Sequence, residues 1–195
     1  MNRTLFRKYL YIGLVLFVLL VLSALYFMGV LSVGGLLVVL LIMFAAGRLI
    51  NYPLRNFYRG LRAFRQRQFV ESEQLFRQFL ADLERRPWIE QLNRFNFSLY
   101  TTNLEAMTWN NLGAIELEQG RFAQAPQFLE RALQIDPAYS KAYFNMAAAA
   151  IGQHEPERAR EYFQKAKDLG FTNDSFDQFL SEVQQAYAAF NSRLS

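Results

Sequence analysis

Residues 109–137 read WNNLGAIELEQGRFAQAPQFLERALQIDP, and this stretch decides the fold. When the chain is compared with itself at an offset of 34 residues, Trp109 falls on Tyr143 and Gly113 falls on Ala147. The other matched pairs are Asn111/Asn145, Leu112/Met146, Ala125/Ala159, Phe128/Tyr162, Leu129/Phe163 and Ala132/Ala166. Large side chains match large ones and small match small, as expected of stacked helical hairpins in which small residues allow close helix approach.

The local sequence signals predict two helices within this unit. Thr102 and Glu105 have the spacing of a capping box, which predicts a helix from there to about Gln119. Gly120 is placed to end that helix as a C-terminal cap. A second helix is expected over residues 122–134. The unit is therefore a helix–turn–helix.

The stretch resembles a tetratricopeptide repeat in Trp109, Leu112, Gly113, Gly120, Phe122, Ala125, Ala132, Asp136 and Pro137. It departs from the pattern at Glu116, where a Tyr is usual, and at Leu129, where an aromatic is usual. The resemblance implies two units, 106–139 and 140–173. In the second unit His154 stands at the place of the turn glycine.

Helical segments are predicted on both sides of the two units. Residues 53–105 are read as a basic juxtamembrane helix, a degenerate repeat-like hairpin and an insertion of about 87–105. Gly60, Phe69 and Phe76 copy the spacing of Gly113, Phe122 and Leu129 at an offset of 53. Residues 174–195 are read as a capping helix with the apolar stripe Phe176, Phe179, Leu180, Val183, Tyr187 and Phe190. A dimer surface is the alternative role for that stripe.

The N-terminal segment is predicted to be a transmembrane hairpin, residues 1–52. No charged residue occurs from Tyr9 to Gly47, and a single helix over this run would be roughly 58 Å long, about twice a hydrocarbon core. Glycines at 29–35 offer a turn, so spans are expected at about 5–28 and 31–50. A cleaved signal peptide is the alternative, but the apolar run is too long for one. The predicted fold class is all-α: a transmembrane helical hairpin, then a short tetratricopeptide-like α-solenoid with a C-terminal capping helix.

The distribution of charge predicts orientation. Nine Lys and Arg residues and no Asp or Glu precede Gln68, so the remainder has 21 − 9 = 12 basic against 17 acidic residues. By the positive-inside tendency, both termini and the repeat domain of an integral, two-span membrane protein would be cytoplasmic. The side chains expected at the bilayer surface are Arg48, Arg55, Arg59 and Arg62. Nucleic-acid binding is not expected.

The first helices of the two units are expected to form a partner-binding groove, as the resemblance implies. The residues placed on that face are Met107, Asn110, Ala114, Leu117, Lys141, Phe144, Ala148 and Ile151. The alternative is that Phe144 and Met107 pack against the insertion or the terminal helix and leave no free groove.

No chemistry is predicted. The chain has one His and no Cys, so catalytic triads and zinc sites lack members, and no cofactor or metal is expected. The chain is read not as an enzyme but as a membrane-anchored scaffold or adaptor that docks a partner peptide or helix, for example in assembly of a membrane complex. The alternative is a permanent accessory subunit of a larger membrane complex. The oligomeric state stays open.

Overall fold

The computed structural model describes residues 13, 17–30, 32–92, 101–171 and 175–191. The elements are α2 (Val33–Asn51), η1 (Tyr52–Leu54), α3 (Arg55–Arg65), α4 (Phe69–Arg85), α5 (Ile89–Leu92), α6 (Leu104–Glu118), α7 (Ala125–Ile135), α8 (Ser140–Gly152), α9 (Pro156–Asp168) and α10 (Phe176–Asn191). Residues 17–27 are also helical. The described residues contain helices and no strand, so the prediction of an all-α chain is confirmed.

The structure contains three helical hairpins, α3–α4, α6–α7 and α8–α9. In each of them the two helices are connected by the same type of turn. Arg67, Gly120 and His154 have φ values of 60°, 70° and 62°, and each lies just beyond the end of the first helix of its hairpin. In each turn the next backbone N–H bonds back into the helix: Gln68 to the carbonyl of Ala63, Arg121 to that of Glu116, and Glu155 to that of Ala150. This is the Schellman arrangement, which satisfies carbonyls at a helix end.

In each of the first two hairpins, the two helices approach each other closely at a glycine. A Cβ built on Gly60 would lie 2.8 Å from the ring of Phe76, and one built on Gly113 would lie 2.6 Å from Leu129. The Ser72 hydroxyl adds a hydrogen bond of 2.9 Å to the carbonyl of Gly60. Glycine is therefore required at both helix crossings.

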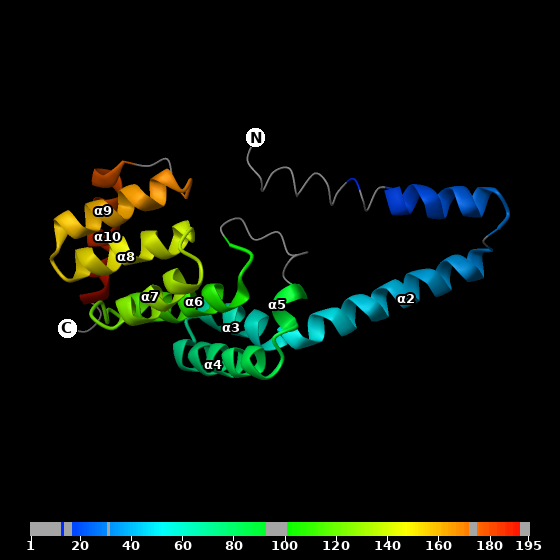
Figure 1. Ribbon diagram of the computed structural model, residues 1–195, viewed down its shortest axis with the longest axis horizontal. Coiled ribbons are helices and arrows are strands. Elements are labelled where there is room, and N and C mark those ends of the chain that lie inside the picture. The colour runs from blue at the N-terminus through cyan, green and yellow to red at the C-terminus, as the bar shows by residue number, and fades with distance from the viewer. Residues whose placement is uncertain (1–12, 14–16, 31, 93–100, 172–174, 192–195) are drawn as a thin grey trace.

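The hairpins stack in sequence order, as Figure 1 shows, with α4 against α6 and then α6 and α7 against α8. One buried cluster joins α3, α4, α5 and α6 through Phe57, Phe79, Ile89 and Leu104. The last helix, α10, packs on α8, where Phe179 joins the buried cluster of α8 and α9. The core is therefore continuous from α3 to α10.

The start of α6 differs from the prediction. The N-cap is Asn103, whose Oδ1 accepts a hydrogen bond of 2.8 Å from the backbone N–H of Ala106, so the prediction that Thr102 caps this helix is wrong by one residue. The backbone N–H of Asn103 in turn donates to the hydroxyl of Thr101. A carboxylate oxygen of Glu90, from α5, accepts from the backbone N–H of Leu104. The insertion thus helps to fix the beginning of α6.

The prediction of a two-span integral membrane protein with cytoplasmic termini is wrong. No helix in the part of the chain that the structure describes is both long enough and apolar enough to cross a membrane. The uncharged part of α2, from Val33 to Gly47, spans roughly 22 Å, against roughly 30 Å for a hydrocarbon core. Of the first predicted span, residues 5–12 and 14–16 lie outside the described residues.

The segment nevertheless turns where the glycines predict. The chain reverses between residues 27 and 33, and Gly29 has a φ of 72°, a conformation that glycine adopts without a steric penalty. Figure 1 shows α2 extending away from the repeats, with the helical residues 17–27 beyond this turn.

Candidate protein-binding surface

The first helices of the two predicted repeats, α6 and α8, lie side by side. The side-chain amide of Asn145 donates a hydrogen bond of 2.8 Å to Oδ1 of Asn110. Asn110 is fully buried, and its own Nδ2 has no hydrogen-bond partner in the described part of the chain. A buried polar group is costly unless it is bonded, so this amide contact helps to fix how the two helices meet.

The eight residues predicted to form the groove fall on α6 and α8, and none of them is exposed. Asn110 and Ile151 are buried. The half-buried residues are Met107, Ala114, Leu117, Lys141, Phe144 and Ala148. Burial lowers the pKa of the Lys141 ammonium because desolvation disfavours its charged form.

The terminal helix α10 covers the α8 half of this surface. The ring of Phe144 lies 4.7 Å from that of Phe171 and 4.6 Å from that of Phe179, between centroids. The hydroxyl of Tyr187 donates a hydrogen bond of 2.7 Å to the carbonyl of Ala148. Burial raises the pKa of Tyr187, which keeps the phenol protonated as a donor.

On the α6 half of the surface, two of the predicted groove residues pack on buried clusters. Met107 packs on the buried clusters beside it, and Leu117 packs on the cluster that contains Leu129. Ala114 lies between them along the helix and has only a methyl group. The accessible part of the predicted groove on α6 is therefore the strip around Ala114, which is half-buried.

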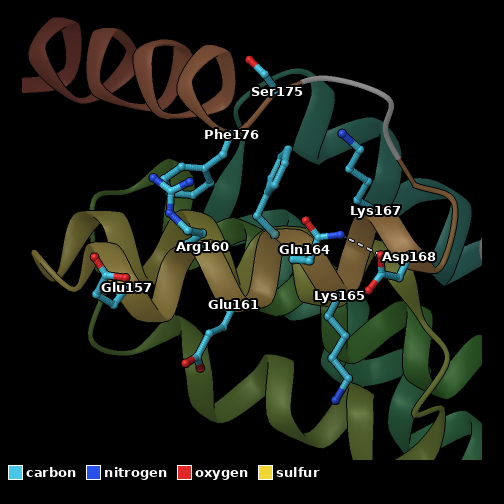
Figure 2. A pocket seen from close by; sticks show the side chains of 10 residues that line it. Glu157, Arg160, Glu161, Gln164, Lys165, Lys167, Asp168, Ser175 and Phe176 are labelled. Carbon is cyan, nitrogen blue, oxygen red and sulfur yellow. Dashed lines mark hydrogen bonds between the residues drawn. The ribbon is translucent and has the colours of Figure 1, made fainter.

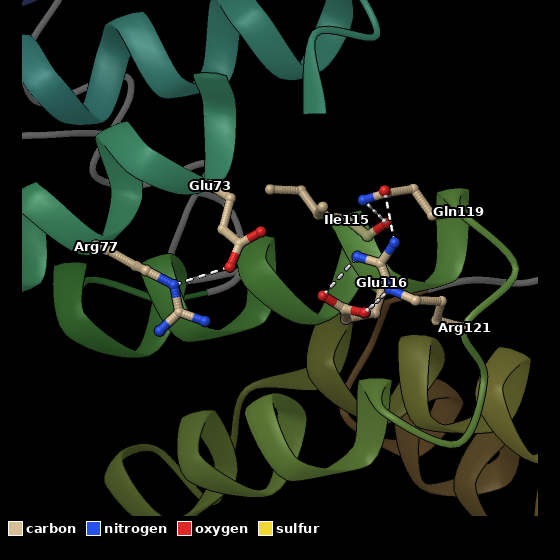
Figure 3. Close-up of polar contacts among 6 residues, drawn as sticks. All are labelled: Glu73, Arg77, Ile115, Glu116, Gln119 and Arg121. Atoms are coloured by element: carbon tan, nitrogen blue, oxygen red, sulfur yellow. Dashed lines mark hydrogen bonds and ion pairs between the residues drawn. The ribbon is translucent and has the colours of Figure 1, made fainter. Parts of the chain in front are cut away.

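An ion pair between a buried carboxylate and a partly exposed arginine stabilises the end of α6, and sequence reasoning missed it. Glu116 is only 6% exposed, and the guanidinium of Arg121 donates to both of its carboxylate oxygens (Figure 3). Nη1 of Arg121 also bonds to Gln119. A bidentate arginine is a strong partner for a carboxylate, which explains how Glu116 replaces the usual Tyr. The basic residue directly after the turn glycine was the available signal.

The arginines predicted to face a bilayer have varied surroundings. Arg55 donates a hydrogen bond of 3.2 Å to the hydroxyl of Tyr52. Arg59 forms an ion pair of 3.7 Å with Glu71. Arg62 is exposed. The side chain of Arg48 lies outside the described residues, and contact of these four residues with lipid stays a prediction.

An open pocket of about 800 Å³ lies between α9 and the beginning of α10 (Figure 2). The residues around it already contact one another: Arg160 lies over the ring of Phe176, and Gln164 donates to Asp168. Three acidic and three basic side chains line it, so it offers no uniform charge to a ligand. Among the described residues, no group of three His, Asp or Glu side chains could hold a metal ion.

Comparison with known proteins supports the repeat. A family model described as tetratricopeptide repeat matches residues 116–176, from the end of α6 to the first residue of α10. No curated protein matches the chain. Tetratricopeptide repeats generally mediate interactions between proteins. The family model thus supports the resemblance over these residues, where the chain is similar to a tetratricopeptide repeat.

Proposed function

We propose that this chain is a protein-interaction scaffold that binds a helix or extended segment of another protein along α6. The observation that carries the proposal is the placement of α6 and α8 by the buried contact between Asn110 and Asn145. With the two first helices fixed in this way, a partner would contact the face of α6. The partner segment would lie beside α10, which already covers the α8 half of the predicted groove.

The chemistry of the surface indicates the kind of segment that fits. The methyl group of Ala114 permits a partner backbone or a large apolar side chain to approach the helix closely. Lys141 is desolvated and forms no ion pair in the described part of the chain. A partner carboxylate placed near Lys141 would restore the interaction that its ammonium loses on burial. An apolar segment with an acidic residue is therefore the expected partner.

The test replaces Ala114 with a residue that fills the strip. Ala114→Arg should abolish capture of partners that crosslink to the wild-type chain in cells, because a guanidinium on a long stem occupies the space that the partner needs. Ala123→Arg is the matched control, since Ala123 is exposed in the turn between α6 and α7. Circular dichroism should show equal helix content in the three proteins. Equal partner recovery with Ala114→Arg and with the wild type would reject the proposal.

A further inference from the structure

One face of α3 carries an excess of positive charge. Four arginines of α3, Arg55, Arg59, Arg62 and Arg65, are followed by Arg67 in the turn after the helix, with no Asp or Glu among residues 55–67. All five are exposed, whereas Phe57, Gly60 and Ala63 of the same helix are buried against α4. The arginine face is therefore the side of α3 that the rest of the chain leaves open.

Only part of this charge is neutralised within the chain. Arg59 pairs with Glu71 at 3.7 Å, and Arg67 pairs with Glu118 at 3.2 Å, with all four side chains solvated. Arg55 contacts the ring and hydroxyl of Tyr52 and no carboxylate in the described residues. Arg62 and Arg65 likewise form no ion pair with the described residues. Three guanidinium groups remain to bind an external anion.

The helix that leads into this face is apolar and exposed. In α2, Leu41 and Phe44 are 72% and 66% exposed, and Tyr52, at the junction with α3, is 58% exposed. Along the chain, exposed apolar side chains are thus followed by a tyrosine and then by arginines. Tyrosine has an amphipathic ring that suits the boundary between apolar and aqueous surroundings.

This order distinguishes between possible anions. An acidic protein segment or a nucleic acid could neutralise the arginines but would leave the side chains of α2 in water. A lipid layer with anionic headgroups offers phosphates to the guanidinium groups and acyl chains to the apolar side chains. The lipid surface therefore matches both features.

We propose that α3 and the exposed apolar side chains of α2, such as Leu41 and Phe44, bind the surface of an anionic lipid layer. Arg55, Arg62 and Arg65 contact headgroup phosphates, Tyr52 lies at the level of the headgroups, and the exposed side chains of α2 contact the outer acyl region. This association takes place at the lipid surface and requires no helix that crosses the layer. It is independent of partner binding on α6.

The test is flotation of the full chain with vesicles of phosphatidylcholine alone or with about one third phosphatidylserine. The wild type should partition more strongly into the anionic vesicles, and raising the salt concentration should reduce that difference, because surface charges are screened. The variant Arg55→Gln/Arg62→Gln/Arg65→Gln should lose about 100-fold in partitioning to anionic vesicles, since each arginine near an anionic surface contributes roughly fivefold. Its partitioning to neutral vesicles should not change.

The matched control is Arg131→Gln/Lys165→Gln/Lys167→Gln, which removes the same charge from exposed positions on α7 and α9. It should behave as the wild type does, apart from a small loss due to the lower net charge. Circular dichroism of both variants confirms that they are folded. The proposal is overturned if the wild type shows no preference for anionic vesicles, or if both triple variants lose the same amount. Binding of the α3 face to polyglutamate or to RNA, without a preference for anionic lipid, also overturns it.

Discussion

Asn145 donates a hydrogen bond to Asn110 at 2.8 Å across the boundary between two helical hairpins, and the same relationship recurs one repeat later between Phe144 and Phe179. In both pairs the two residues are 35 positions apart in the sequence. The ring centroids of Phe144 and Phe179 lie 4.6 Å apart. The helix α10 therefore contacts α8 at the position one repeat after the amide pair. The polar contact between α6 and α8 is replaced there by an aromatic one.

Removing one member of the amide pair should destabilise the stack. Asn145→Ala leaves the buried Oδ1 of Asn110 without its donor, which should lower the free energy of unfolding by about 1–2 kcal/mol. The double variant Asn110→Ala/Asn145→Ala should lose less than the sum of the single variants, because no orphaned amide remains. Urea unfolding followed by circular dichroism measures these values, and strictly additive losses would show that the pair is not coupled.

Filling the close approach of α6 and α7 should also destabilise the chain. Gly113→Ala places a Cβ 2.6 Å from Cδ2 of Leu129, which is fully buried and has little room to move. Overpacking costs about 1–3 kcal/mol, which exceeds the roughly 1 kcal/mol that alanine gains over glycine in a helix. Thermal unfolding should show a lower midpoint for Gly113→Ala. The substitution Leu129→Ala should cost less in that background than in the wild type, and an equal cost in both would contradict the explanation.

The sequence predicts the local part of this fold well. The offset of 34 residues and the turn glycine identify the α6–α7 hairpin, because helix periodicity and capping depend on neighbouring residues. The structure begins α7 at Ala125 rather than at residue 122, because the chain forms a turn there first.

Features that depend on tertiary contacts were not predictable in the same way. Sequence reasoning left open whether Phe144 is free, and only the path of the chain after Phe171 brings α10 over it. The N-cap of α6 is Asn103 rather than the predicted Thr102. Glu90 of α5 contacts this helix start through the backbone N–H of Leu104. The prediction of two membrane spans relied on the length of one uncharged run, whereas no described helix in that run is both long and apolar enough to cross a membrane.

Relieving the backbone at His154 should stabilise the chain. His154 has a φ of 62°, which is unfavourable for a residue with a Cβ, and Gly120 takes the same position in the preceding hairpin. His154→Gly should therefore raise the free energy of unfolding by about 0.5–1 kcal/mol after the greater unfolded-state entropy of glycine is subtracted. The reciprocal substitution Gly120→His should lower it. Chemical denaturation of both variants checks the pair, and a loss with His154→Gly would contradict the assignment of strain.

Glu90 should make stability depend on pH. Burial raises the pKa of its carboxyl, although the backbone N–H groups of Leu104 and Glu105 act in the opposite direction. A carboxyl with a raised pKa in the folded state contributes stability below its unfolded pKa, and that contribution is lost as the pH rises through the folded pKa. Glu90→Gln binds no proton, so its unfolding free energy should fall less than that of the wild type between about pH 4.5 and 7.

The control for this prediction is Glu84→Gln, at an exposed position of α4. It should keep the pH dependence of the wild type in urea unfolding at the same pH values. Identical slopes for Glu90→Gln and the wild type would show that the buried carboxyl has no part in the pH dependence.

The most direct test of the proposed scaffold is photo-crosslinking in cells from a single residue, either on the proposed binding face of α6 or on the exposed surface of α7. A photoreactive amino acid replaces Ala114 of α6 in one protein and Arg131, exposed on α7, in the other. The scaffold predicts one defined protein partner that crosslinks from position 114 and is absent from position 131. Crosslinking of the same proteins from both positions, or of none from position 114, would contradict it.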